Sequence, residues 1–333
     1  MVKGLKPLKG KRVVELCTLL PCPFVGLLLS DLGAEVVKIE PPQGDLTRTV
    51  PPFAYGMGLM YHALNRGKTI QIKDLRNSGE LLSVKRMILD SDILLLNLLS
   101  SRLRDLGIDL QQITKDRPDL LILHIPAYPS FSPKAEHPAH DLNLVGLSGA
   151  LHWNSLPLPL QAADITGALL GIITILSALI EGKGGIFEVP LSLGAMIAAF
   201  PIYTRFPHPS QDEPSNRFLE GDSPLYSIYR TKDNKRVSLA AIEPHFVSVV
   251  LNRVGGIDRN ALSQWFGSKT LKEVLEAFSG FDACIEPVIP PWEAPLHLAF
   301  KPYFAPLNAP EGTFLLPVTP YATEIPKGCW VKY

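Results

Sequence analysis

Short apolar runs alternate with helical patterns along this 333-residue chain, and this alternation constrains the fold more than any other feature. The runs are RVVEL (12–16), EVVKIE (35–40), KTIQIKDL (68–75), DILLLNL (92–98) and LLILHIPA (120–127). Between them lie helical patterns such as FVGLLLSDLGA (24–34) and GELLSVKRMIL (79–89). Strands that alternate with helices form parallel sheets covered on both faces. The sequence therefore predicts an α/β fold with a doubly wound parallel sheet.

The first strand, turn and helix do not carry a dinucleotide motif. The turn between Leu16 and Phe24 contains no glycine, so the GxGxxG fingerprint is missing, and no P-loop lysine motif occurs. Lys plus Arg and Asp plus Glu both number 32, which leaves no net charge to attract a nucleic acid or an anionic membrane. We therefore expect no dinucleotide, no nucleic-acid partner and no membrane partner.

A change in composition divides the chain into two domains. The polar, proline-rich stretch FPHPSQDEPSN (206–216) predicts a connector, which separates a large domain (1–206, linker 207–216) from a small domain (217–301). In the small domain, alternating residues around Asp233 and Asn234 predict a hairpin, and helical patterns follow from Pro244 to Val254 and from Leu271 to Ala277. The small domain is therefore expected to be α+β, and the tail (302–333) to be loop-rich and to return to the large domain.

The four cysteines are Cys17, Cys22, Cys284 and Cys329. One pair is five positions apart, but no matching His or Cys cluster accompanies it, so neither a disulfide framework nor a zinc site is expected. Cys17 and Cys284 lie in apolar runs, where buried, unreactive cysteine is common. The sequence thus predicts a reducing compartment, no catalytic thiol and no metal ligands.

Targeting signals are not evident in the sequence. The basic N-terminus MVKGLKPLKGKRVV is not followed by the apolar stretch of a signal peptide, and the last three residues match no lipidation or peroxisomal signal. The uncharged stretch from Gly167 to Ile180 has 14 residues. Because roughly 20 are needed to cross a bilayer, it is expected to be a buried core helix. We therefore expect a soluble, cytoplasmic protein.

Three ionisable residues are candidates for chemistry. Asp164 opens the apolar helical pattern QAADITGALLG, where a helix N-terminus favours a carboxylate, although it could simply be the N-cap. His140 precedes another helical run, and in the simpler interpretation Asp141 caps that helix while His140 fills a turn. Glu243 ends the apolar run SLAAIE, where a charge needs a partner, either His140 or the amides of the next helix.

A compact basic turn at Asn65, Arg66, Gly67 and Lys68 precedes a strand. Such a turn could contact phosphates, or it could be an ordinary solvated turn. The residues alone leave both interpretations open.

Several strings resemble CoA-transferase family III, the superfamily of formyl-CoA transferase and carnitine CoA-transferase. They are LKPLKGKRVVEL (5–16), LLSDLGAEVVKIEPPQGD (28–45), NRGKTIQIKDL (65–75), DLGIDLQQI (105–113), AADITGALLGIITILSALI (162–180) and EGKGGIFEVPL (181–191). HDLNLVGLSGAL (140–151) and EGDSPLYSIYRTKDNKRVSLAAIEPHF (220–246) are most similar to the α-methylacyl-CoA racemase branch. The resemblance spans most of the chain and all three candidate residues.

The resemblance implies roles for the three candidates. His140 and Asp164 would be the two acid–base groups on either side of the substrate α-carbon, and Glu243 would hold His140. Inversion next to a thioester needs one group to remove the proton and another to return it on the opposite face. Amides near Asp164 could stabilise the enolate oxygen. In the transferase branch the same aspartate is instead a nucleophile that forms a mixed anhydride. A third possibility is an inactive acyl-CoA-binding homologue.

The resemblance also implies coenzyme A as part of the substrate, with no metal and no permanently bound cofactor. The candidates for contact with its phosphates are Lys38, Asn65, Arg66, Lys68, Arg102 and Arg104. Two family strings differ here: an Asn-Phe-Arg-Pro-Gly string reads NLLSS (97–101), and prolines replace glycines in IPAYPSFSPKAEHPA (125–139). Relatives form interlocked homodimers, so Glu243 is expected to pair with His140 of the other subunit.

Overall fold

The computed structural model describes residues 4–152, 159–204, 221–322 and Tyr333. By its internal contacts the chain divides into two compact units. The large unit comprises Met1–Ile202 and Pro302–Tyr333, and the small unit comprises Tyr203–Lys301. The predicted linker, 207–216, lies outside the described residues.

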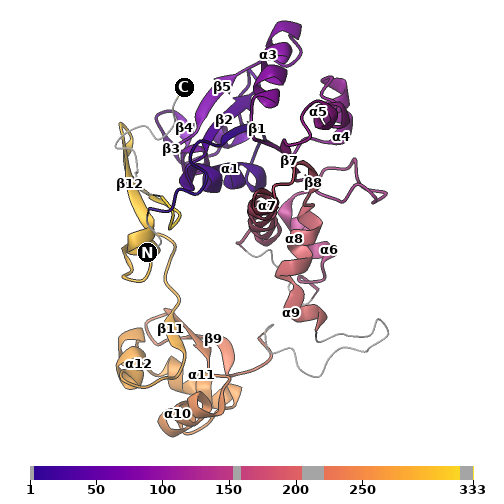
Figure 1. Ribbon diagram of the computed structural model, residues 1–333. Helices are drawn as coiled ribbons and strands as arrows, with labels where there is room; N and C mark the ends of the chain where they lie inside the picture. The colour runs from indigo at the N-terminus through magenta and orange to yellow at the C-terminus, as the bar shows by residue number, and fades with distance from the viewer. Residues whose placement is uncertain (1–3, 153–158, 205–220, 323–332) are drawn as a thin grey trace. The chain divides into compact units, whose positions relative to one another are not determined.

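The large unit is built on a six-stranded parallel sheet in the order β5-β2-β1-β6-β7-β8. Its strands are β1 (Arg12–Leu16), β2 (Glu35–Glu40), β5 (Thr69–Ile72), β6 (Ile93–Leu96), β7 (Leu121–His124) and β8 (Gly185–Glu188). The chain runs outward from β1 through β2 to β5 and then crosses to β6 on the other side of β1. Figure 1 shows β5, β2 and β1 on one side of the sheet and β7 and β8 on the other. The carboxyl ends of β1 and β6 therefore form a topological switch point, where open α/β sheets bind ligands.

Helices cover both faces of this sheet, because both sets of alternating strand side chains are apolar. They are α1 (Pro21–Asp31), α2 (Leu59–Asn65), α3 (Ser78–Leu89), α4 (Ser100–Asp105), α5 (Leu110–Asp116), α6 (Asp141–Leu147), α7 (Ala162–Glu181), α8 (Leu191–Ala198) and α9 (Phe200–Tyr203). Val13, Leu95 and Leu123 share one core cluster with residues of α1 and α7. Leu94 and Ile122 share the other with residues of α3, α4 and α5. The predicted doubly wound α/β fold is confirmed.

The helix α7 is longer than the sequence pattern indicated. It has 20 residues, and its mean hydropathy of 2.0 makes it the one helix in the described ranges long and apolar enough to cross a membrane. The length argument made from the 14-residue stretch was therefore wrong. The helix nevertheless packs closely inside the unit: a Cβ on Gly171 would lie 3.1 Å from a methyl group of Leu123 in β7. Such packing is typical of a core helix.

The small unit is a three-stranded antiparallel sheet, order β11-β10-β9, packed with helices. Its elements are β9 (Tyr226–Arg230), β10 (Arg236–Ala240), α10 (Pro244–Val254), α11 (Arg259–Gly267), α12 (Leu271–Phe278) and β11 (Ile285–Pro287). The hairpin β9–β10 turns at Asn234, whose φ of 60° suits asparagine in a tight turn. The predicted hairpin, both helices and the α+β class are confirmed.

The C-terminal segment contains more structure than predicted. β12 (Phe304–Ala309) and β13 (Gly312–Pro317) form an antiparallel hairpin in the large unit. Glu311 accepts hydrogen bonds from the backbone N–H groups of Tyr55 and Gly56, at 3.0 and 3.2 Å. These lie between β3 (Phe53–Ala54) and β4 (Met57–Gly58), after a 3₁₀ turn at Leu46–Thr49. The prediction of a loop-rich tail was wrong.

Two predictions about the cysteines were also wrong. Cys17 and Cys22 are joined in a disulfide, because the turn after β1 folds back against the first turn of α1. Cys284 is exposed rather than buried, since it precedes the edge strand β11. Cys329 lies outside the described residues.

Candidate functional site

Asp164 lies at the start of α7 but is not its N-cap. Gln161 holds the cap position, and Asp164 is the third helical residue. Its carboxylate is 7% exposed and accepts a hydrogen bond from Gln161 Nε2 at 3.2 Å. The first turn of a helix carries partial positive charge from its free N–H groups, which favours a carboxylate there. The interpretation of Asp164 as a simple cap is therefore wrong, since the cap lies three residues earlier.

His140 lies at the start of α6, directly before Asp141. It holds the N-cap position, and its backbone N–H donates to Asn143 Oδ1 at 3.0 Å, so the prediction that Asp141 is the cap is wrong. Asp141 is instead the first helical residue, and its Oδ1 accepts the backbone N–H of Asp164 at 3.0 Å. This bond ties the start of α6 to the start of α7. The structure thereby joins the two helix starts that carry His140 and Asp164, and their predicted catalytic roles stay predictions.

The electrostatics of this pair of helix starts favour proton transfer by Asp164. Burial, and then the nearby negative charge of Asp141, raise the pKa of Asp164 to about 6. Both carboxylates are under 9% exposed, so water screens their repulsion poorly. A carboxyl group with a pKa near neutrality can both accept and return a proton at physiological pH.

The substitution Asp141→Asn tests this coupling. Asparagine keeps the oxygen that accepts the Asp164 N–H but removes the charge, so the pKa of Asp164 should fall below about 6. Wherever Asp164 acts as a base, the rise of kcat/KM with pH should then begin at lower pH. The measurement is a pH–rate profile, with the exposed cap variant Asp109→Asn as the control. An unshifted acidic limb would contradict the coupling.

A cavity of about 400 Å³ opens beside these helix starts. The described residues that line it are His140, Asp141, Leu142, Val145, Leu151, Pro159, Leu160 and Gln161. Most are apolar, and none of these described lining residues is a lysine or an arginine. The cavity therefore has a polar edge, formed by His140, Asp141 and Gln161, and an otherwise apolar wall.

Glu243 lies in the small unit and caps α10 at its N-terminus, directly before Pro244. It is exposed, as is Ile242, because β10 already ends at Ala240. The argument that its charge needs a partner in an apolar run was therefore wrong. His140 belongs to the large unit, and the pairing of Glu243 with His140 stays a prediction.

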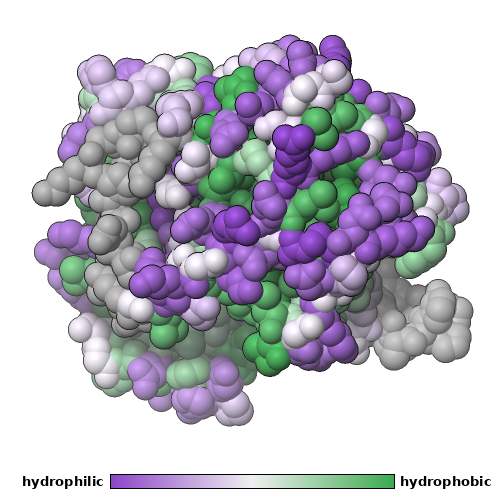
Figure 2. Space-filling view, turned by 45° about the horizontal axis from the view of Figure 1, so that its top comes forward, coloured by the Kyte–Doolittle hydropathy of each residue, from purple (hydrophilic) through white to green (hydrophobic). Residues whose placement is uncertain are grey.

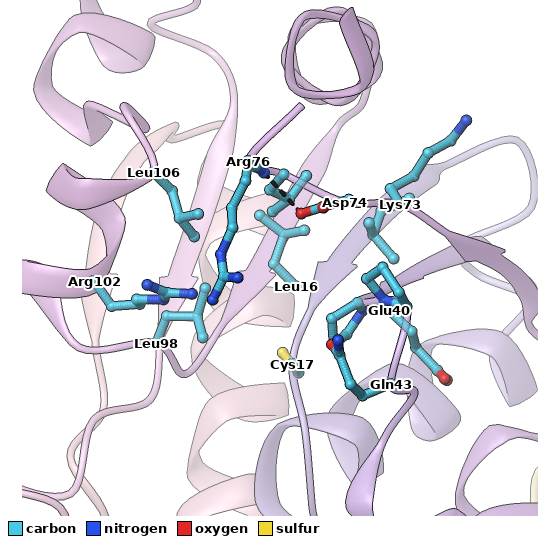
Figure 3. A pocket seen from close by; sticks show the side chains of 14 residues that line it. Leu16, Cys17, Glu40, Gln43, Lys73, Asp74, Arg76, Leu98, Arg102 and Leu106 are labelled. Atoms are coloured by element: carbon cyan, nitrogen blue, oxygen red, sulfur yellow. Dashed lines mark hydrogen bonds between the residues drawn. The ribbon is translucent and has the colours of Figure 1, made fainter. Parts of the chain in front are cut away.

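A second cavity of about 190 Å³ lies at the switch point, at the carboxyl ends of β1, β2 and β6. Arg76 and Arg102 line it, and their guanidinium groups point toward one another, whereas Lys73 points away (Figure 3). Arg102 was predicted from the sequence, and Arg76 was not. The sequence feature that could have pointed to Arg76 is the basic, asparagine-containing stretch KDLRN directly after β5. Two converging guanidinium groups suit phosphate oxygens.

The other predicted phosphate ligands lie elsewhere. Arg104 is exposed, 3.9 Å from Glu136, and lines a neighbouring groove with His124. Lys38, Asn65, Arg66 and Lys68 are each at most 2% exposed. The prediction of an exposed basic turn, shared by both of its interpretations, is wrong because tertiary packing encloses these side chains.

These buried cations belong to an ion-pair network. Lys38 donates to Glu15 at 3.1 Å and to Asp45 at 2.9 Å, and Lys68 donates to the other oxygen of Glu15 at 2.8 Å. Arg66 forms a bidentate pair with Asp31, both bonds at 2.5 Å. The network joins β1, β2 and the turn before β5, and it therefore holds one half of the sheet together beside the switch-point cavity.

A doubly wound sheet with a cationic cavity at its switch point is the arrangement in which many α/β proteins bind phosphate-bearing ligands. The described part of the chain shows no cluster of three or more His, Cys, Asp or Glu side chains that could hold a metal ion.

Comparison with known proteins gives the family. The profile of CoA-transferase family III matches residues 8–324, and the chain belongs to that family, whose members use substrates linked to coenzyme A. The mouse α-methylacyl-CoA racemase is 29% identical over 317 residues, covering 87% of this chain and 79% of the racemase. A succinate–glutarate CoA-transferase from Agrobacterium fabrum is 34% identical over 189 residues, covering 53% of this chain and 47% of the transferase.

The fold has solved relatives. The crystal structure of a CAIB/BAIF family protein from Brucella suis superimposes with a TM-score of 0.81 at 22% identity, covering 95% of this chain and 92% of that chain. This likeness concerns the fold alone. The resemblance to CoA-transferase family III is thus confirmed, while racemases and transferases both occur among the relatives.

Proposed function

We propose that the protein is an α-methylacyl-CoA racemase-like enzyme, which inverts the α-carbon of a 2-methylacyl-CoA thioester. The observation that carries the proposal is the joined start of α6 and α7. There, the backbone N–H of Asp164, whose carboxyl group has a pKa of about 6, bonds to Asp141, and Asp141 lines a largely apolar cavity together with His140. The alternatives are CoA transfer through Asp164 and a silent acyl-CoA-binding homologue.

In the proposed reaction one of the two groups removes the α-proton and the other returns a proton on the opposite face. The thioester oxygen carries negative charge in the intermediate. The first amides of α7, on Ala162 and Ala163, precede the first intrahelical bond, which runs from Ile165 N–H to Gln161 O at 3.0 Å. Free amides at a helix start are suited to stabilise such an oxyanion.

The cavity of about 400 Å³ beside the starts of α6 and α7, which would hold the acyl group, supports a racemase over a transferase of dicarboxylic acids. A dicarboxylic acyl group has a second carboxylate, which is costly to bury without a cation or several donors. The walls contributed by Leu142, Val145, Leu151 and Leu160 instead match a branched hydrocarbon. This favours 2-methylacyl groups.

The switch-point cavity supports the coenzyme A part of the substrate. The nucleotide end of coenzyme A carries a 3′-phosphate and a diphosphate, which Arg76 and Arg102 would bind. No metal ion or permanently bound cofactor is needed for this scheme.

A second copy of the chain is proposed to complete the site. Apolar side chains reach the surface in several places (Figure 2), and on α7, α8 and α9 they form an exposed set. The set comprises Leu169, Ile173, Ile180, Leu193, Met196, Ile197 and Phe200. An interlocked homodimer would cover this surface and would allow Glu243 of the other subunit to orient His140.

The decisive experiment is α-proton exchange in heavy water with (2R)- and (2S)-2-methylacyl-CoA. If the protein is a racemase, deuterium from the solvent should enter the α-position of the substrate, and the two epimers should interconvert. Transfer of coenzyme A between acids without any exchange would replace this proposal with the transferase alternative. Binding of the thioesters without exchange and without transfer of coenzyme A would support the third alternative, an inactive acyl-CoA-binding homologue.

A further inference from the structure

The disulfide between Cys17 and Cys22 lies at the switch-point cavity. Cys17 directly follows β1, and Cys22 is the second residue of α1. Their Cα atoms are 5.8 Å apart, within the range that a disulfide spans. The pair therefore closes the turn between the first strand and the first helix, which is the position where doubly wound folds contact a nucleotide.

The backbone of this turn is constrained by more than the disulfide. Leu19, between the two cysteines, has a φ of 65°, a left-handed conformation that a leucine rarely adopts. Asn97, directly after β6, accepts the Thr18 N–H at 3.3 Å and donates to the Thr18 carbonyl at 2.9 Å. Opening the disulfide removes one of the constraints that keep Leu19 in this conformation, so the turn is free to relax.

Access to the two sulfur atoms differs. Cys17 lines the cavity with Arg76 and Arg102, and Figure 3 shows its sulfur between Leu16 and Gln43, apart from the two guanidinium groups. Both cysteines are buried in the same apolar core cluster, with Cys17 6% and Cys22 0% exposed, and of the two only Cys17 lines the cavity. A small thiol that enters the cavity can therefore reach Cys17 but not Cys22.

We propose that Cys17 and Cys22 form a thiol–disulfide exchange site that sets the affinity of the switch-point cavity for the nucleotide part of coenzyme A. The oxidised pair holds the turn in the form that binds, and reduction weakens binding. The proposal rests on the placement of the coenzyme A nucleotide proposed above.

The exchange step uses a low-molecular-weight dithiol as reductant. One of its thiolates bonds to the sulfur of Cys17, the bond between the cysteines breaks, and its electron pair passes to the sulfur of Cys22. The start of α1 favours that negative charge. The second thiolate of the dithiol then closes the reductant into its own disulfide and releases Cys17, so that two electrons and two protons reach the protein. A low-molecular-weight disulfide reverses the step.

Binding and oxidation are then reciprocally linked. If reduction weakens binding by about tenfold, the bound nucleotide must make the pair harder to reduce by the same factor. For this two-electron couple a tenfold change is about 30 mV in reduction potential. Ligand in the cavity also covers Cys17, which slows its reduction.

The test uses the variant Cys284→Ser/Cys329→Ser, in which the pair provides the remaining thiols, and adenosine 3′,5′-bisphosphate as a thiol-free probe. Calorimetry on the oxidised protein and on the same protein reduced with a phosphine should show affinity falling by about tenfold. The further variant Cys22→Ser should bind as weakly as the reduced protein in both conditions. Circular dichroism establishes that each form is folded.

Two results would overturn the inference. Equal affinity of the oxidised and reduced forms removes the redox dependence and leaves the nucleotide site intact. Binding by neither form removes the nucleotide placement and this inference with it. A second readout, the rate of reduction followed by intact mass, should fall when the probe is present.

Discussion

Asp164→Asn is expected to abolish epimer interconversion while one epimer still exchanges its α-proton. Removing one of two acid–base groups costs roughly 10²- to 10⁴-fold in rate. His140 would still remove the proton on its own side and return a deuteron to the same face. The substituted amide side chain is neutral and cannot accept the proton from the other side. Exchange measured by mass spectrometry, separately for each pure epimer, detects the asymmetry.

The matched variant is His140→Gln, which should show the opposite epimer preference. Each variant then serves as the other's control, since misfolding would abolish both exchanges alike. Both side chains lie at helix starts whose backbone bond, Asp164 N–H to Asp141, does not depend on the substituted side chains. Equal loss of exchange for both epimers in a folded Asp164→Asn protein would contradict the two-base scheme.

Glu15→Gln is expected to destabilise the large unit by about 3–5 kcal/mol. Glu15 is fully buried and faces two ammonium groups, Lys38 at 3.1 Å and Lys68 at 2.8 Å. Glutamine keeps the size but removes the negative charge, so two buried cations would retain only Asp45 as a contacting carboxylate. Urea-induced unfolding followed by circular dichroism measures the change in the free energy of unfolding.

The comparison is Asp119→Asn, which removes a carboxylate from a surface pair. Asp119 lies 2.9 Å from Arg117, and its side chain is 73% exposed. Exposed pairs typically contribute under about 1 kcal/mol, so this variant should unfold close to the parent. A Glu15→Gln protein that also unfolds close to the parent would show that the network does not stabilise the fold.

The fold could be predicted because its signal is local and repeated. Each buried strand reads as an apolar run, and alternation with helices leaves few topologies. The tail hairpin β12–β13 was missed because Pro306 and Pro317 obscure a strand pattern. The disulfide was missed because a spacing of five does not reveal that the turn folds back on α1.

The candidate site was less predictable than the fold. His140 and Asp164 were selected by resemblance, since each alone has an ordinary capping interpretation. Their connection through Asp141 is a tertiary hydrogen bond, which leaves no pattern in the sequence. The basic turn was wrongly predicted to be exposed, because a run of Lys and Arg residues does not show which carboxylates will enclose it in the fold.

The buried ion-pair network has a consequence for how the sheet assembles. Glu15 on β1 contacts the ammonium groups of both Lys38 and Lys68, so β2 and the turn before β5 packed together without β1 would enclose two ammonium groups that lack this carboxylate. Such a half-formed state carries a penalty of several kcal/mol. β2 and the turn before β5 are therefore expected to gain their full stability only once β1 is in place, which makes β1 the strand on which cooperative folding of this half of the sheet depends.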